Sequence, residues 1–120
     1  MSEATNFKPK WTMPETGADI ARFAESLMIS RARLAEVIGV TTAELNQNKL
    51  SGSTQDRLQP LLDVYNRAIW LAEDETKAAC WMNHGYPRGL GRGSPLDWIG
   101  KGEAEYVKNV QGAVHAGVHA

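Results

Sequence analysis

Apolar residues recur at steps of three and four along the chain, from residue 16 to residue 110. This spacing places them on one face of an α-helix, whereas a half-buried strand would alternate apolar and polar residues. The sequence shows neither such alternation nor an Asn-Gly hairpin signal. The pattern therefore predicts an all-α fold of six or seven helices.

Capping residues divide the first half of this pattern into three helices. Thr16 and Ser30 are N-cap candidates, because a hydroxyl oxygen there can accept a hydrogen bond from a free N–H of the first turn. Thr41 or Thr42 begins a third helix, which we expect to end near Leu50.

The strongest apolar stripe in the chain contains a proline. A proline inside a helix removes a backbone hydrogen bond and clashes with the preceding turn, but it is favoured at the first helical position. We therefore expect a helix boundary near Gln59, with Pro60 opening a new helix. Leu62 and Ile69 on this stripe, and Trp81 on the following helix, are predicted to be core residues.

A glycine-rich loop follows the helix that opens near Asp74. Glycine and proline recur too often for regular structure between residues 84 and 93. Ser94 and Pro95 then provide the N-cap and the first position of a short helix. A last helix leads to residues 112–120, whose small side chains allow no prediction of secondary structure.

The first fifteen residues precede the helical pattern. Pro9 and Pro14 interrupt regular structure, and the polar side chains around them bury little surface. We expect a flexible segment over residues 1–15; the alternative is that Phe7 and Trp11 pin it to the body.

The composition narrows the class of protein. The chain has 120 residues, of which 42% are hydrophobic, enough for one ordinary globular domain. The single cysteine, Cys80, excludes an intramolecular disulfide and a cysteine-rich zinc site, and it fits the reducing cytoplasm. We expect neither a transmembrane helix nor a secretory signal. The net charge of −1 lacks the basic excess of a typical nucleic-acid binder.

Residues 30–50 have the form of a helix-turn-helix, in which a small residue, Ala35, allows the helices to cross and Gly39 allows the tight turn. Residues 31–67 carry five basic and four acidic side chains, a balance of only +1. An ordinary helical hairpin is the alternative interpretation. Side-chain amides can read adenine edges, and a lysine can contact a phosphate. DNA contact is therefore predicted at exposed residues of the second helix: Thr42, Asn46, Gln47 and Lys49.

No pattern of reactive side chains points to an enzyme. Residues 89–93 alternate glycine with other residues but lack the strand and the Gly-Lys-Ser ending of a nucleotide-binding loop. Two pairs stand at helical spacing, Cys80 with His84 and His115 with His119, and neither has a third group that would complete a metal or catalytic site. We expect a non-catalytic protein without cofactor or metal.

Several of these pieces stand in a characteristic order. The helix-turn-helix is followed by the apolar stripe of residues 61–72, by Trp81-Met82, and by the string Leu90-Gly91-Arg92-Gly93-Ser94-Pro95-Leu96. Over residues 18–120 this order resembles the Xre/MbcA/ParS antitoxin family. That family has an Xre-type helix-turn-helix and a C-terminal domain with a helix ending in Trp-Leu, a Pro/Gly loop, a Leu-Gly-Gly-x-[Ser/Thr]-Pro-Leu segment, and a valine-containing last helix.

The resemblance implies a type II antitoxin of the cytoplasm. Its partner would be a RES-domain toxin that consumes NAD or uses it for ADP-ribosylation, and the antitoxin would cover the NAD site. Some family members also bind their own promoter DNA as dimers, so a homodimer or a hetero-oligomer with the toxin is expected. The alternative is a helix-turn-helix repressor whose contact with a toxin is secondary or absent.

The resemblance also divides the chain. An Xre-like helix-turn-helix region, residues 16–59, merges with a C-terminal toxin-binding domain, residues 60–120. Residues 113–120 carry no charged side chain when histidine is neutral, so they can enter a cleft without burying an unpaired charge. The implied toxin-binding residues lie in the loop, the short helix and this end: Arg88, Leu90, Arg92, Ser94, Trp98, Val114, His115, Gly117, Val118 and His119.

Overall fold

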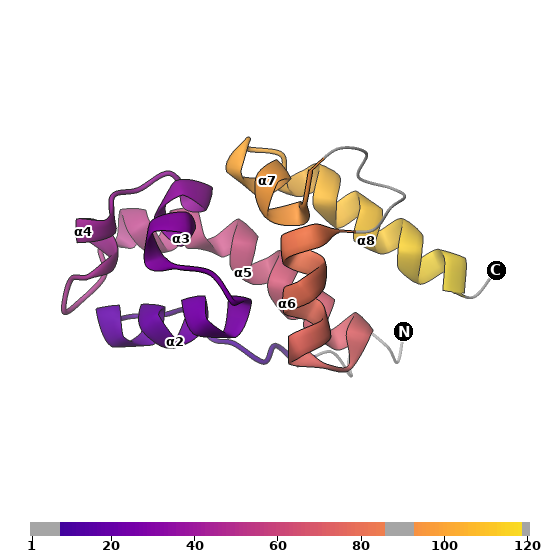
Figure 1. The fold of residues 1–120 in the computed structure, drawn as a ribbon, viewed down its shortest axis with the longest axis horizontal. Helices are drawn as coiled ribbons and strands as arrows, with labels where there is room; N and C mark the ends of the chain where they lie inside the picture. Colours follow the sequence, from indigo (N-terminus) through magenta and orange to yellow (C-terminus); the bar gives the residue numbers. More distant parts are fainter. Residues whose placement is uncertain (1–7, 86–92, 119–120) are drawn as a thin grey trace.

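The computed structural model describes residues 8–85 and 93–118, and within these ranges the regular structure is seven α-helices and no strand (Figure 1). This confirms the expected all-α class and the expected number of helices. The helices are α2 (Gly17–Leu27), α3 (Arg31–Ile38), α4 (Thr42–Leu45), α5 (Gly52–Ala72), α6 (Glu75–His84), α7 (Pro95–Gly100) and α8 (Ala104–Val118).

The expected capping residues begin and end the first helices. The hydroxyl oxygens of Thr16 and Ser30 accept hydrogen bonds from the backbone N–H three residues ahead, at 3.1 and 3.0 Å. Gly39 ends α3 in the left-handed conformation, with φ at 77°. Thr41, rather than Thr42, caps α4. Short-range hydrogen-bonding chemistry thus sets these helix ends.

Helix α5 is the central element of the fold, and it packs against α3, α6, α7 and α8. It is continuous over 21 residues and contains Pro60, so the helix boundary expected near Gln59 is wrong. Leu58 and Leu61 are completely buried on either side of the proline. Burial of one uninterrupted apolar face offsets the hydrogen bond that Pro60 cannot donate.

One apolar core receives side chains from all seven helices. Leu62 lies in this core with 5% of its surface exposed, as predicted. Ile69 and Trp81 are only half-buried, and they pack against the margin of the core. The regions 16–59 and 60–120 therefore share both the helix α5 and the core.

Residues 9–15 form an extended strap that lies beside α2 and leads into its first turn (Figure 1). The Trp11 ring packs edge-on against Phe23 of α2, with 5.4 Å between ring centroids. Pro14 is buried, and its carbonyl oxygen accepts a hydrogen bond from Gln55 Nε2 at 2.9 Å. The expectation of a flexible segment is therefore wrong for the strap, and Trp11 pins it as the alternative proposed. Phe7 lies outside the described residues.

The last two helices are joined by a close turn. Helix α7 packs against α3, α6 and α8, and a Cβ placed on its Gly100 would lie 3.7 Å from the Cα of Val37 in α3. Helix α8 continues to Val118, so residues 112–118, for which the sequence allowed no prediction, are helical. In the described part of the chain, no helix combines the length and apolarity needed to cross a membrane.

Candidate functional site

The described part of the loop–α7–α8 region begins with a buried cap. Ser94, 5% exposed, accepts a hydrogen bond from the Asp97 N–H at 3.1 Å, and Asp97 Oδ2 accepts one from the Ser94 N–H at 2.9 Å. Hydrogen bonds from the Ser94 N–H and then from Arg33 hold the pKa of Asp97 below its usual value. Ser94 thus fixes the start of α7, and its contact with a toxin stays a prediction.

Asp97 also joins α7 to the first half of the fold. Its Oδ1 atom accepts a hydrogen bond from Arg33 Nη2 of α3 at 2.6 Å, and Arg33 Nη1 donates to Glu36 at 2.8 Å. Two carboxylates therefore share one guanidinium, beside a hollow of about 360 Å³ that Gly93 also lines. The orientation of α7 depends on α3 as well as on its own cap.

A cluster of aromatic and cationic side chains covers the surface where α7 meets α8. The rings of Trp98 and Tyr106 lie 4.9 Å apart, and Lys101 Nζ lies 5.0 Å from the centroid of the Trp98 ring. Trp98 is half-buried, and 37% of the Tyr106 surface is exposed. We name Trp98, Lys101 and Tyr106 the α7–α8 patch. Exposed aromatic residues beside a cation are typical of protein-binding surfaces.

The remaining predicted toxin contacts lie beyond this patch. Arg88, Leu90, Arg92 and His119 lie outside the described residues. Val114, His115, Gly117 and Val118 lie in the last turns of α8, and the structure describes only their backbone. At about 1.5 Å of rise per residue, Gly117 lies about 17 Å along α8 from Tyr106 of the patch.

The predicted DNA-binding residues do not share a helix. Helix α4 ends at Leu45, so Thr42 opens it, whereas Asn46, Gln47 and Lys49 follow it in exposed irregular structure. The expected helix end near Leu50 is therefore wrong.

The strap and α2 supply the physical reason for this early helix end. The Gly17 N–H donates to the Gln47 carbonyl oxygen, and the Leu50 N–H donates to the Glu15 carbonyl oxygen, both at 2.9 Å. Arg31 Nη1 donates to Asn46 Oδ1 at 2.7 Å. The Gln47 carbonyl oxygen and the Leu50 N–H are thereby paired outside α4, whereas the Asn46 N–H keeps its helical bond to the Thr42 carbonyl oxygen at 3.1 Å.

The surface around α4 offers polar groups without a recognition helix. Arg31 and the three residues 46–48 line a shallow hollow of about 260 Å³ beside the start of α2. Glu44 adds a carboxylate, whose pKa is lowered by hydrogen bonds from the Thr41 N–H and hydroxyl. A helix of four residues is too short to lie along a major groove in the way a recognition helix does.

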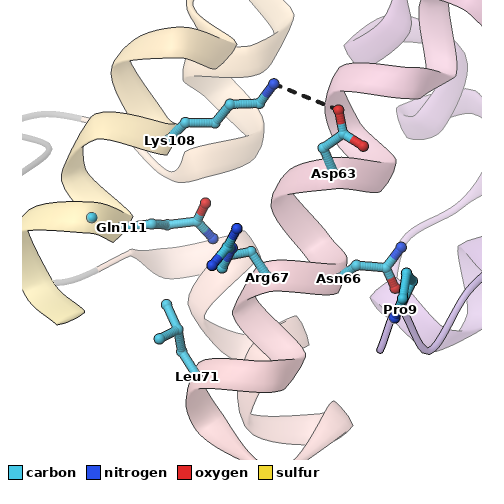
Figure 2. Close-up of a pocket in the computed structure, with 8 residues that line it drawn as sticks. Pro9, Asp63, Asn66, Arg67, Leu71, Lys108 and Gln111 are labelled. Atoms are coloured by element: carbon cyan, nitrogen blue, oxygen red, sulfur yellow. Dashed lines mark ion pairs between the residues drawn. The ribbon is translucent and has the colours of Figure 1, made fainter. Parts of the chain in front are cut away.

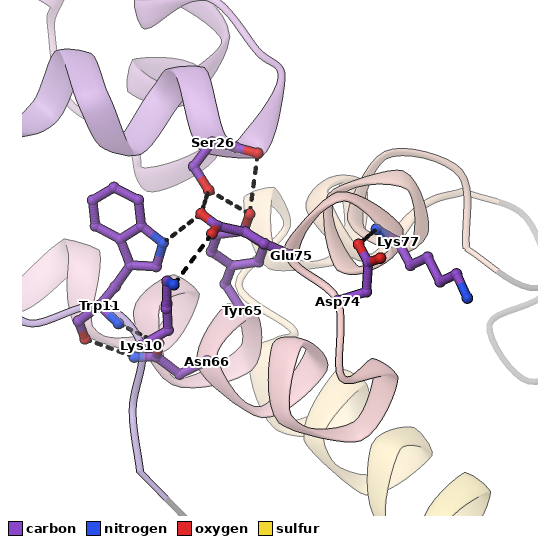
Figure 3. Close-up of polar contacts among 8 residues, drawn as sticks. All are labelled: Lys10, Trp11, Ser26, Tyr65, Asn66, Asp74, Glu75 and Lys77. Carbon is purple, nitrogen blue, oxygen red and sulfur yellow. Dashed lines mark hydrogen bonds and ion pairs between the residues drawn. The ribbon is translucent and has the colours of Figure 1, made fainter.

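A polar cluster that the sequence analysis did not find joins the strap to α2, α5 and α6 (Figure 3). Glu75 accepts hydrogen bonds from the Ser26 hydroxyl and from Trp11 Nε1, the latter at 3.1 Å. Tyr65 Oη lies 2.6 Å from Ser26 Oγ, and Lys10 Nζ lies 3.9 Å from Glu75 Oε1. Since the five residues are spread over 66 positions of the sequence, no local spacing reveals the cluster.

Asn66, which lies next to this cluster, is the residue whose role the sequence could have indicated. It is a polar residue on the apolar stripe of α5, and only 6% of its surface is exposed. The Trp11 N–H donates to Asn66 Oδ1 at 2.8 Å, and Asn66 Nδ2 donates to the Trp11 carbonyl oxygen at 2.9 Å. Both ends of a buried amide are thus satisfied by the backbone of one residue.

A hollow of about 460 Å³ lies between α5 and α8, next to the start of the strap (Figure 2). Lys108 Nζ lies 3.5 Å from Asp63 Oδ2 across it, and Gln111 Nε2 donates to the Val64 carbonyl oxygen at 2.9 Å. These groups hold α8 against α5. Among the residues that the structure describes, no group of three or more His, Cys, Asp or Glu could hold a metal ion.

In comparisons with known proteins, no family model, no curated protein and no solved structure matches the chain.

Proposed function

We propose that this protein is an antitoxin that binds a RES-domain toxin and neutralises it by covering its NAD site. The proposal starts from the sequence resemblance. The observation that supports it best is the α7–α8 patch, in which the exposed ring of Tyr106, the half-buried ring of Trp98 and Lys101 lie beside Gly93 at the end of the glycine-rich loop. Aromatic anchors of this kind contribute much of the affinity of protein interfaces.

We assign docking of the toxin and covering of its NAD pocket to opposite ends of α8. The patch at the start of the helix docks the toxin, and the uncharged end of the chain covers the NAD pocket about 17 Å further along. Because α8 is helical to Val118, the covering element is a helix end that is ordered before binding. A pre-ordered end loses less conformational entropy on binding than a free tail would.

The alternative function, a helix-turn-helix repressor, has less support. Helix α4 is a single turn, and three of the four predicted DNA contacts lie outside it. Binding of the chain's own promoter DNA is therefore proposed only as a secondary property of the antitoxin.

The test is neutralisation of a RES-domain toxin, to be sought first in the reading frame next to the one that encodes this chain. We expect the full chain to co-purify with the toxin and to abolish its NAD turnover. Trp98→Ala is expected to weaken binding at least tenfold, because it removes the central ring of the patch. Trp70→Ala, a matched change at a half-buried tryptophan of α5, is expected to change binding less than twofold.

A second variant tests the covering element. Deletion of residues 113–120 should leave a weaker complex in which NAD turnover returns at saturating antitoxin. Full inhibition by an intact truncated complex would show that the end of α8 is not the cover. No binding of any RES-domain toxin by the folded full chain would overturn the antitoxin proposal.

A gel-shift titration with the upstream DNA at two salt concentrations tests the alternative. Steep weakening with salt would indicate phosphate contacts, and alanine at Thr42, Asn46, Gln47 and Lys49 together should then remove binding. DNA binding that depends on these residues, in a chain that binds no toxin, would establish the repressor function instead.

A further inference from the structure

The groove beneath the strap has the features of a site for an extended peptide. Side chains of α2, α5 and α6 contact the strap (Figure 3), and the surface that they form under it is what we call the groove. Pro9 and Pro14 frame the strap, and proline restricts the backbone before it binds.

The groove contacts Trp11 through three kinds of interaction. The Asn66 amide accepts from the backbone N–H of Trp11 at 2.8 Å and donates to its carbonyl oxygen at 2.9 Å. These two bonds recognise the extended main chain and do not depend on the side chain at that position. Phe23 packs edge-on against the indole ring, and Glu75 accepts the indole N–H at 3.1 Å. Main-chain hydrogen bonds combined with a pocket for one side chain are the usual means of recognising an extended peptide.

Polar contacts extend the match on both sides of the tryptophan. Glu75 also faces Lys10, at 3.9 Å, so a basic residue is favoured just before the aromatic one. On the other side, Gln55 donates to the Pro14 carbonyl oxygen at 2.9 Å. The groove therefore fits the pattern Lys-Trp-x-x-Pro, which the chain itself carries at residues 10–14.

We propose that this groove is a peptide-binding site, and that the strap of a second copy of this chain is its occupant in trans. An identical segment satisfies every contact described above, and exchange of identical segments is a low-cost route to a dimer. The strap of the same chain competes at an effective concentration in the millimolar range, so exchange is favoured only where that strap is released. The inference is independent of the antitoxin proposal, because it involves neither toxin nor DNA.

The first experiment weakens the strap of the full chain and supplies its sequence in trans. A fluorescein-labelled peptide of residues 8–15 is titrated with the wild-type chain and with Trp11→Ala, and binding is followed by fluorescence anisotropy. We expect the peptide to bind the Trp11→Ala chain at least tenfold more tightly than the wild type. A peptide with alanine at the tryptophan position should not bind.

Matched second substitutions test the groove. Adding Asn66→Ala to Trp11→Ala should weaken peptide binding at least tenfold. Adding Gln59→Ala, an exposed change on the same helix, should leave it unchanged. Equal binding to the wild type and to Trp11→Ala, or no binding to a Trp11→Ala chain that keeps its helical circular dichroism and its cooperative melting, would overturn the peptide site.

Hydrogen exchange of the wild-type chain keeps the proposal testable if Trp11→Ala does not fold. A releasable strap predicts that the Trp11 amide exchanges at least tenfold faster than the amide of Leu62 in α5, once both are corrected for intrinsic rates. Exchange of both amides at one common rate would mean that the strap opens only with global unfolding, and it would overturn the proposal.

A mixing experiment identifies the occupant. The Trp11→Ala chain retains a complete groove, and the Asn66→Ala chain retains a complete strap. Labelled with a donor and an acceptor dye, the two variants should show energy transfer when mixed, and neither should show it with itself. Peptide binding without energy transfer in the mixture would rule out the second copy as the occupant.

Discussion

At the scale of single residues, a donor and an acceptor can be assigned to the hydrogen bonds that link Glu75, Ser26 and Tyr65 beneath the strap. Glu75 has no proton to give as a carboxylate, so the Ser26 hydroxyl donates to it. Ser26 Oγ can then only accept from Tyr65, whose Oη lies 2.6 Å away. The chain of hydrogen bonds therefore requires the protonated form of Tyr65.

Tyr65 is predicted to make stability depend on alkaline pH. Its side chain is fully buried, and burial, to which the Glu75 carboxylate adds, raises its pKa from 10.0 to about 12. Because the folded state favours the proton, this stabilisation is complete below pH 10 and is lost as the pH rises toward 12. At about 1.4 kcal/mol per pKa unit, we expect a loss on the order of 2 kcal/mol in the free energy of unfolding.

Urea unfolding between pH 9 and pH 12 measures this effect. Tyr65→Phe should lack the part of the decline that the wild type owes to Tyr65. Tyr106→Phe, which changes a surface tyrosine, should keep it. Parallel pH profiles for the wild type and Tyr65→Phe would contradict the assignment.

At the scale of elements, local rules were sufficient where one residue sets a helix end. Thr16, Ser30 and Ser94 cap their helices as predicted, because capping depends on atoms within three residues. The local rules failed at α4 and at Pro60. Helix α4 ends early because the strap and α2 bind residues 46–50, and α5 continues through Pro60 because its buried face is uninterrupted. Both outcomes depend on contacts with distant segments, which spacing does not reveal.

Pro60 should therefore weaken the helix that contains it. Pro60→Ala restores a backbone donor in the interior of α5 and removes the clash of the ring with the preceding turn. We expect the free energy of unfolding to rise by about 1 kcal/mol, less than the full helix-interior penalty of about 3 kcal/mol, because alanine also leaves the unfolded chain more flexible. Thermal and urea unfolding measure the change. A lower stability of Pro60→Ala would mean that the ring packs productively at this site.

At the scale of the whole molecule, the candidate surfaces were only partly predictable. Trp98 was placed correctly on a short helix, but its neighbours Lys101 and Tyr106 come from the end of α7 and from α8. Asn66 and Glu75 were not found, because their role depends on the strap folding back onto α5 and α6. A single sequence indicates which residues are unusual, whereas tertiary contacts decide which of them meet.

The shared helix α5 and the Arg33–Asp97 ion pair predict that the two halves of the chain unfold together. Leu34 in α3 and Leu96 in α7 are both completely buried, and both belong to one core. Leu34→Ala and Leu96→Ala should each destabilise the whole molecule by roughly 2–5 kcal/mol, because each leaves a cavity in that common core. The matched pair places the same change in the two regions that the sequence separated at residue 59.

Amide hydrogen exchange and urea unfolding distinguish a common core from two independent ones. In either variant, tryptophan fluorescence and far-ultraviolet circular dichroism should report one coincident transition, shifted to lower urea with an unchanged slope. The slowest amides of α3 and of α8 should lose equal protection, because both exchange through the same global unfolding. If Leu34→Ala lowered protection only in the first half of the chain, α5 would not couple the halves, and a surface on α3 and α4 would then be energetically independent of the α7–α8 patch.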